Sequence, residues 1–375
     1  MAERQPVGFG RREPTVEPRA GVVERPFPGG AARLDDQLVA RLLPERPVRG
    51  HKGSFGKILV IAGSLDYAGS ALLVCRAAGR SGVGLVTLAI PESLQPLFAA
   101  KVVEATTMAL PEDDVEEVDP EPAIARILDH EHDALVVGPG LRPGLATTEL
   151  VRSLLAVPPE IDAAPIVLDA EALRSMATMD GWWLGERRPA VLTPHAGEFA
   201  RLRAGSGGQP PDDGDLEGDD DARLKAAVDA ATRWRSVVVL KGARTVIADA
   251  DGTAAFAPFE NPALATGGTG DVLAGTIGGL LAQGLTPFAA ARLGVYLHGL
   301  AGDAIRERFG DAGLLASDLP DAIALARKRL VAVAERAAAG GRLGFTARET
   351  APASATATIA APAAPDAPPP PSDRS

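Results

Sequence analysis

The chain has 375 residues with 38 Lys and Arg against 49 Asp and Glu, a formal net charge of -11, and no basic stripe that would attract nucleic acid. Its single cysteine, Cys75, excludes an intrachain disulfide, and no apolar run reaches the roughly 18 residues that a membrane span needs. These features argue against disulfide-rich, membrane-spanning and nucleic-acid-binding classes, so we expect a soluble cytoplasmic protein with no nucleic-acid and no membrane partner.

Composition divides the chain into one folded unit and two tails. Residues 1–35 mix Arg, Glu, Pro and Gly without a period, and residues 337–375 end in a mixture of Ala, Pro and Thr. Neither segment offers enough apolar surface to offset the entropy of ordering, so we expect both to be disordered. A single domain is predicted over residues 36–336. Within it, the stretch 205–221 is rich in Gly, Pro and Asp and is predicted to be a mobile acidic surface loop.

The folded part alternates short β-branched runs with longer Ala- and Leu-rich segments, beginning with a strand at 57–62 and a helix at 71–80. Continuous apolar runs are typical of strands that are buried on both faces of a parallel sheet. Residues 245–257 are predicted to form a hairpin, because Asp251-Gly252 favours a tight turn. The pattern predicts an α/β fold whose mostly parallel central sheet is mixed at one edge and covered by helices on both faces. Further strands are predicted at 84–90, 134–137, 165–169, 190–193 and 237–240, and further helices at 270–283, 287–308 and 319–336.

The segment from Asn261 to Asp271 gives the clearest functional signal. It reads Asn-Pro-Ala-Leu-Ala-Thr-Gly-Gly-Thr-Gly-Asp and is followed at once by an apolar helix. Free amides at a helix N-terminus carry partial positive charge and can hold a phosphoryl group as it is transferred. Asp271 could be a simple helix cap, but a cap needs one polar residue, whereas three glycines cost backbone entropy. The predicted anion hole consists of Gly267, Gly268, Thr269 and Gly270.

Four other segments follow predicted strands, at the edge where parallel sheets bind ligands. The glycine-containing stretches 63–70 and 138–141 would let a ligand approach the backbone, although a tight turn explains either one equally well. Thr-Pro-His195 places an imidazole after a buried strand, where it either binds a ligand or satisfies a local hydrogen bond. Residues 241–245 bring two cations to the same edge and form either a phosphate site or a solvated turn.

Taken together, the ordered segments are His51-Lys-Gly-Ser-Phe-Gly56, Gly63-Ser64 to Ser70, Gly138-Pro-Gly140-Leu141, Val167-Leu-Asp169-Ala-Glu-Ala172-Leu173, Thr193-Pro-His195, Lys241-Gly242 and Ala265-Thr-Gly-Gly-Thr-Gly-Asp271. This set resembles the ADP- or ATP-dependent NAD(P)H-hydrate dehydratase family of the ribokinase-like superfamily, over roughly Leu38 to Arg329. The resemblance implies a ribokinase-like three-layer fold.

In that family the nucleotide phosphorylates a ring hydroxyl on the S-epimer of hydrated NADH or NADPH, and loss of phosphate restores the reduced dinucleotide. The resemblance implies conversion of ADP to AMP, with ATP as the alternative donor and Mg²⁺ as the cofactor. It makes Asp271 the catalytic base. By the same resemblance, Lys241, Gly242, Ala243, Arg244, Thr245 and Gly270 would bind the nucleotide, and Ser70, Gly140, His195 and Asp271 would bind the hydrate.

Two positions depart from the family pattern. Ser70 stands where family members often carry alanine. Ribokinase-like relatives carry an Asn-x-x-Glu element that helps to organise Mg²⁺, and the matching span here is His195-Ala-Gly-Glu198, which allows Glu198 an outer-shell role. The resemblance also implies a homotetramer. Because the chain has no room for the epimerase domain that is fused to many relatives, we expect a separate NAD(P)H-hydrate epimerase.

Two other functions remain open from the sequence. A small-molecule kinase of the same superfamily, such as a hydroxyethylthiazole or hydroxymethylpyrimidine kinase, would share the glycine loop and the base. A catalytically silent dinucleotide sensor would keep the pocket without needing Asp271. The Lys-Gly-Ser-Phe-Gly start and His195 after Thr-Pro favour the dehydratase.

Overall fold

The computed structural model describes residues 30–158, 160–161, 164–185, 188–208, 216 and 218–346. A ten-stranded sheet forms its centre, in the order β1-β12-β11-β10-β9-β8-β7-β2-β3-β4. All neighbouring strands run parallel except at β11, which is antiparallel to both β10 and β12. The strands are β1 (Ala32–Arg33), β2 (Lys57–Ile61), β3 (Leu85–Pro91), β4 (Thr106–Leu110), β7 (Ala134–Val137), β8 (Ile166–Leu168), β9 (Ala190–Leu192), β10 (Val237–Leu240), β11 (Val246–Ala248) and β12 (Ala254–Phe256).

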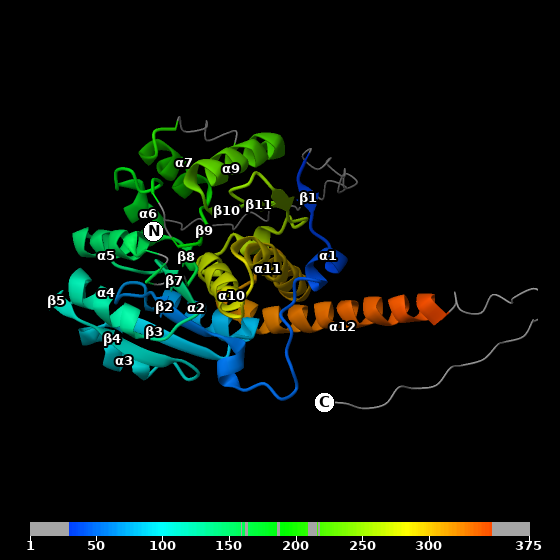
Figure 1. The fold of residues 1–375 in the computed structure, drawn as a ribbon, viewed down its shortest axis with the longest axis horizontal. Helices are drawn as coiled ribbons and strands as arrows, with labels where there is room; N and C mark the ends of the chain where they lie inside the picture. Colours follow the sequence, from blue (N-terminus) through cyan, green and yellow to red (C-terminus); the bar gives the residue numbers. More distant parts are fainter. Residues whose placement is uncertain are drawn as a thin grey trace, which may run out of the picture.

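Helices cover both faces of this sheet (Figure 1). In β2, Ile58 and Val60 pack into one buried cluster with α2, α10, α11 and α12. Their neighbours Leu59 and Ile61 pack into a second cluster with α4, α5, α6, α7 and α9. Because alternate side chains of a strand point to opposite faces, the two clusters are the two sides of one sheet, and the predicted three-layer α/β arrangement is confirmed. The helices are α1 (Asp36–Ala40), α2 (Ala68–Ser81), α3 (Gln95–Ala99), α4 (Pro120–Asp129), α5 (Leu145–Ala156), α6 (Glu171–Ala177), α7 (Ala196–Gly205), α9 (Asp220–Trp234), α10 (Thr269–Ala282), α11 (Pro287–Phe309) and α12 (Leu319–Thr346).

The predicted hairpin is present as β11 and β12, with Gly252 at a φ of +88° in its turn. The short strands β5 (Glu112–Asp114) and β6 (Glu117–Val118) form a separate two-stranded sheet that the sequence did not predict. No helix in the described ranges is long and apolar enough to cross a bilayer.

The boundaries of the folded unit differ from those predicted. Strand β1 pairs with β12, Leu34 is completely buried, and the Leu34 amide donates to the Phe256 carbonyl at 3.0 Å. The predicted start at residue 36 was therefore several residues too late, because a two-residue strand leaves no periodic pattern in the sequence. Helix α12 continues to Thr346, ten residues past its predicted end, and its distal part extends beyond the rest of the described ribbon in Figure 1. Residues 1–29 and 347–375, and residues 209–215 and 217 of the predicted loop at 205–221, lie outside the described residues.

The chain reverses the direction in which it adds strands between β2 and β7. From β2 it proceeds outward to β3 and β4, and from β7 it proceeds the other way through β8, β9 and β10. Open α/β sheets bind ligands at such a switch point, beyond the carboxyl ends of the strands. Gly63 follows β2 and Gly138 follows β7, and the Gly63 amide donates to the Pro139 carbonyl at 2.9 Å. The two loops thus meet at the edge where a ligand is expected.

Candidate active site

The loop after β7 packs directly on the first turn of α2. Gly140 has a φ of +67°, and a Cβ there would lie 2.7 Å from the Ser70 Cβ and 2.8 Å from the Tyr67 carbonyl oxygen. Only glycine therefore fits both the left-handed conformation and the close approach. The structure brings together Ser70 and Gly140, which the resemblance assigned to the same substrate.

The N-terminus of α10 carries the glycine loop. Gly268 precedes the helix with a φ of +89°, and no side chain caps this end. Within the described part of the chain, no backbone carbonyl accepts a hydrogen bond from the amides of Gly267, Gly268, Gly270 or Asp271. These free donors agree with an anion hole, since the first turn of a helix leaves its amides unpaired.

Thr269 departs from its predicted part in the anion hole. Its amide donates to the Thr266 carbonyl at 3.3 Å, and its hydroxyl donates to the carbonyls of Leu264 and Thr266 at 2.8 and 2.9 Å. Both of its polar hydrogens are therefore used to fold the loop. Thr269 therefore shapes the glycine loop without contributing a free donor.

Asp271 stands in the first turn of α10 and is half-buried. Burial raises the pKa of its carboxyl group to about 6, with a further contribution from Asp169, while a hydrogen bond from Ser70 and the charge of Lys241 lower it. Its bond to Ser70 reaches across to α2, which is not the contact of a helix cap. A carboxylate with a pKa near the working pH is suited to accept a proton from a substrate hydroxyl.

Lys241 lies next to Asp271 in a cluster of buried charges. Its Nζ atom is 2.8 Å from Asp169 Oδ1 and 3.7 Å from Glu198 Oε2. Burial lowers the pKa of Lys241, but these two carboxylates outweigh it and raise the pKa above the usual value. A Cβ at Gly270 would lie 3.4 Å from the same Nζ, so the ammonium stands beside the glycine loop. Sequence reasoning assigned Asp169 no role, although its position directly after β8 could have marked it.

His195 caps helix α7. Its Nδ1 atom accepts a hydrogen bond from the Gly197 amide at 3.1 Å, and the Glu198 carboxylate accepts one from the His195 amide at 3.0 Å. The imidazole side chain is 54% exposed, and its Nε2 atom is 3.5 Å from Glu198 Oε1. His195 is therefore not a core residue, and its ring can be reached from solvent. The loop lies beside Lys241, whose amide donates to the Pro194 carbonyl at 2.9 Å.

A cavity of about 510 Å³ opens next to the glycine loop. Lys241, Gly242, Ala243, Thr245 and Gly270 line one part of it, and these are five of the six predicted nucleotide residues. The rest of its wall is mainly apolar and includes Phe259, Leu264, Leu273 and Val295. A cavity whose wall carries both polar and apolar groups suits a ligand that carries phosphate and a planar base.

Arg244, the sixth predicted nucleotide residue, does not line this cavity. It has a φ of +55°, its guanidinium pairs with Asp220, and it lies over the Phe256 ring at 4.5 Å from the centroid. The sequence placed a cation at the right edge of the sheet but could not show that its side chain turns inward. The prediction that Arg244 contacts phosphate is therefore corrected: its side chain packs beneath the loop of residues 241–245.

His298 also lines the cavity, and sequence reasoning did not single it out. Burial lowers the pKa of its ring to about 4, so it is neutral near pH 7. Its Nε2 atom is 2.9 Å from the Thr269 carbonyl, to which it donates. Because His298 stands inside a long apolar helix, no motif marks it in the sequence.

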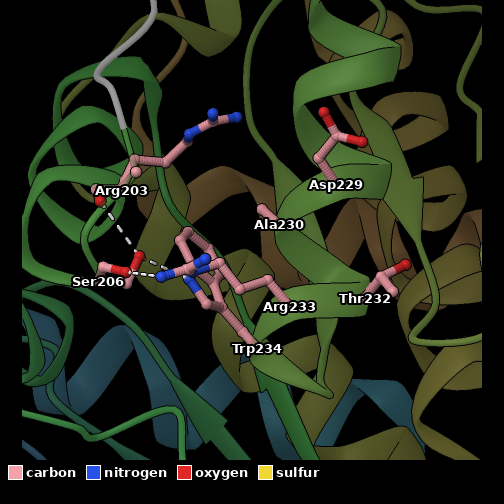
Figure 2. Close-up of a pocket in the computed structure, with 8 residues that line it drawn as sticks. Arg203, Ser206, Asp229, Ala230, Thr232, Arg233 and Trp234 are labelled. Atoms are coloured by element: carbon pink, nitrogen blue, oxygen red, sulfur yellow. Dashed lines mark hydrogen bonds between the residues drawn. The ribbon is translucent and has the colours of Figure 1, made fainter.

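A second cavity, of about 380 Å³, lies between α7 and α9 (Figure 2). None of the predicted site residues lines it. Arg233 donates to the Ser206 carbonyl there, and Trp234 Nε1 donates to Ser206 Oγ at 3.0 Å. These contacts join the end of α7 to the end of α9, away from the carboxyl edge of the sheet.

A family model described as NAD(P)H-hydrate dehydratase matches residues 58–325. The bifunctional NAD(P)H-hydrate repair enzyme Nnr of Moorella thermoacetica is 41% identical over 302 residues, which are 80% of this chain and 54% of that protein. The ADP-dependent (S)-NAD(P)H-hydrate dehydratase of Bacillus subtilis is 34% identical over 296 residues, 78% of this chain and 97% of the relative. The chain thus spans about half the length of the bifunctional relatives that it matches.

Solved structures give the same result. The ADP/ATP-dependent NAD(P)H-hydrate dehydratase from Bacillus subtilis, co-crystallized with ATP/Mg²⁺, aligns with a TM-score of 0.67 at 32% identity, covering 80% of this chain and 99% of that one. A ribokinase-like superfamily protein from Enterococcus faecalis aligns with a TM-score of 0.65 at 25% identity, covering 82% of this chain and 99% of that one. The predicted ribokinase-like fold is confirmed. With a matching family model over most of the sequence and relatives aligned nearly end to end, the chain belongs to the NAD(P)H-hydrate dehydratase family.

Proposed function

We propose that the protein catalyses the ADP-dependent dehydration of the S-epimer of hydrated NADH and NADPH, a lyase reaction that repairs damaged dinucleotide. The observation that supports this most strongly is the position of Asp271. Its raised pKa suits a base, its carboxylate is hydrogen-bonded to Ser70, and its neighbour Gly270 lines the large cavity with Lys241. Ser70, which we assign to the hydrate, and Lys241 and Gly270, which we assign to the nucleotide, thus adjoin one carboxylate.

The nucleotide would occupy the cavity of about 510 Å³. Its terminal phosphoryl group would lie against the free amides before α10 and the Lys241 ammonium, where backbone dipoles and a buried cation stabilise negative charge. The apolar wall suits the adenine base. ADP is the proposed donor, and its product would be AMP.

The hydrate would lie on the other side of Asp271, against Ser70, Gly140 and the exposed ring of His195. Asp271 would take the proton of the ring hydroxyl while that oxygen attacks the terminal phosphorus of ADP and AMP leaves. Loss of the new phosphate from its ring carbon, with a proton from the neighbouring carbon, would restore the double bond. Phosphate is a better leaving group than hydroxide, which is the purpose of the first step.

We infer that Mg²⁺ accompanies the nucleotide. Among the described residues no cluster of three or more His, Cys, Asp or Glu side chains is arranged to hold a metal ion. Mg²⁺ usually keeps several waters and binds through substrate phosphates and one or two carboxylates. The buried carboxylates of Asp169 and Glu198, both within 4 Å of Lys241 Nζ, fit contact through such waters. The ion would supply charge neutralisation on the phosphates.

A direct assay tests the proposal. Chemically hydrated NADH, mixed with the protein, ADP and Mg²⁺, is expected to give a rise in NADH absorbance that requires all three additions. A small-molecule kinase would instead consume nucleotide with a thiazole or pyrimidine alcohol and leave the hydrate unchanged. A silent sensor would bind the hydrate without forming NADH. Absence of the absorbance rise with both ADP and ATP would contradict the proposed reaction.

The pH dependence of this reaction should follow Asp271. Because the base must be ionised, kcat/KM for the hydrate is expected to be high above pH 6 and to fall about tenfold per pH unit below it. Ser70→Ala removes the hydrogen bond that lowers the pKa of Asp271, so the acidic limb should move to higher pH. Rate profiles of both proteins measure the two limbs. If the limbs coincide, Ser70 does not tune Asp271.

Three further expectations stay predictions for this chain: a cytoplasmic location, assembly as a homotetramer, and a separate epimerase that interconverts the hydrate epimers. Size measurement in solution checks the second. Loss of the R-epimer only when an epimerase is added would agree with the third.

A further inference from the structure

A buried arginine lies beneath the loop that we assign to the nucleotide phosphates. Arg223 belongs to α9 and is only 3% exposed. Its Nη1 atom donates to the Ala243 carbonyl, and its Nη2 atom donates to the carbonyls of Leu240 and Lys241 at 3.3 and 3.4 Å. One side chain thus holds three carbonyls of a four-residue segment.

The conformation of Gly242 agrees with this support. Its φ is +149°, and a Cβ there would lie 2.8 Å from Arg223 Nη2. The guanidinium therefore fills the space that a side chain at this position would need. In a trans peptide the carbonyl and the following amide point in opposite directions. Because the Lys241 carbonyl turns toward Arg223, the Gly242 amide turns away from it, and Gly242 lines the cavity.

Charged side chains of both signs lie beneath the loop. Asp220 pairs with the guanidinium of Arg244, and its Oδ1 atom is 3.8 Å from Arg223 Nη1. Glu260 is 3.6 Å from Arg244 Nε but is half-exposed, so water screens it. Among the described residues, the buried arginines Arg223 and Arg244 thus share the partly buried carboxylate of Asp220. Burial lowers the pKa of Arg223 and Asp220 raises it, yet a guanidinium stays protonated in proteins. The positive charge of the Arg223 guanidinium, held against the loop carbonyls, favours an anion above the loop.

We propose that Arg223 is a positioning residue for the nucleotide phosphates, which it reaches through the loop from Leu240 to Ala243. The inference rests on the proposed nucleotide site and adds a residue that does not line it. Arg223 fixes the loop so that its amides face the cavity, and it supplies positive charge from below. Its removal should weaken binding in proportion to the number of phosphates on the ligand.

Arg223→Met is the first test, with ADP, AMP and adenosine as probes in titration calorimetry. ADP binding is expected to weaken about tenfold or more, AMP less, and adenosine less than about twofold. KM for ADP should rise while KM for the hydrate stays unchanged. The matched control is Arg233→Met, on the same helix, because Arg233 also donates to a backbone carbonyl, that of Ser206, far from this loop. The control should bind all three probes like the wild type.

Other outcomes would overturn the inference. ADP affinity that is unchanged in Arg223→Met removes any positioning role. Equal losses for ADP and adenosine show a general collapse of the cavity instead of a role toward phosphate. If Arg223→Met fails to fold, Arg223→Lys replaces it. Lysine keeps the positive charge but lacks the rigid fork of donors with which the guanidinium contacts the three carbonyls. Wild-type ADP binding in that variant also overturns the inference.

If the wild-type protein itself binds no ADP, the proposed nucleotide site fails and the inference fails with it. If it binds ADP normally and only the Arg223 result is negative, the proposed function stands.

Discussion

Asp271→Asn is expected to lower turnover by about 10³-fold while the fold and the affinity for ADP stay close to those of the wild type. Asparagine has the shape of aspartate and can still accept the hydrogen bond from Ser70, but it cannot take the proton of the substrate hydroxyl. Without that proton acceptor, the hydroxyl is a poor nucleophile toward phosphorus. Single-turnover kinetics with hydrated NADH and calorimetry with ADP measure the two quantities.

The same experiment has an internal control in its pH profile. The acidic limb near pH 6 should disappear in Asp271→Asn, because the group that titrates there is gone. Asp321→Asn is the matched variant, since Asp321 also stands in the first turn of a helix but pairs at the surface with Arg76 and Arg80. It should leave turnover unchanged. Turnover of Asp271→Asn within tenfold of the wild type would show that another group is the base.

The interior of the sheet could be predicted because burial on both faces leaves a simple pattern. Strand β7 has the limits predicted for it, since all four of its residues are apolar and buried. The edges could not be predicted in this way. β4 begins at an exposed threonine and is only partly buried, and β1 has two exposed residues, so neither forms an apolar run. Their pairing depends on neighbours that are distant in the sequence.

The residues of the candidate site also differ in whether the sequence could reveal them. Asp271 and the glycines could be found because their arrangement in the chain is itself the feature that exposes helix amides. The direction in which a side chain points depends on neighbours that the fold brings together, so the sequence could not reveal it. Arg244 turns under its loop, and Lys241 pairs with an aspartate that is 72 residues away in the chain. A cation in a loop predicts positive charge at an edge, but not which group that charge faces.

His195 offers the second large effect. If its ring holds the hydrated dinucleotide, a lost hydrogen bond to a polar or charged group costs about 1.5–3 kcal/mol, which is roughly 10- to 150-fold in affinity. His195→Ala should therefore raise KM for the hydrate by that factor and leave KM for ADP nearly unchanged. Steady-state kinetics with each substrate varied in turn gives both constants.

Alanine alone cannot separate binding from structure, because Nδ1 of His195 caps α7 by accepting from the Gly197 amide. Loss of that cap should cost about 1 kcal/mol of stability and lower the melting temperature of His195→Ala. Asparagine is a good N-cap, so His195→Asn should keep the cap and the melting temperature while it removes the ring and its Nε2 atom. A raised hydrate KM in both variants, with a lowered melting temperature only in the alanine variant, assigns Nε2 to the substrate. If His195→Asn instead restores the wild-type KM, the ring acts only as a helix cap, and the hydrate must be held by other groups at the sheet edge.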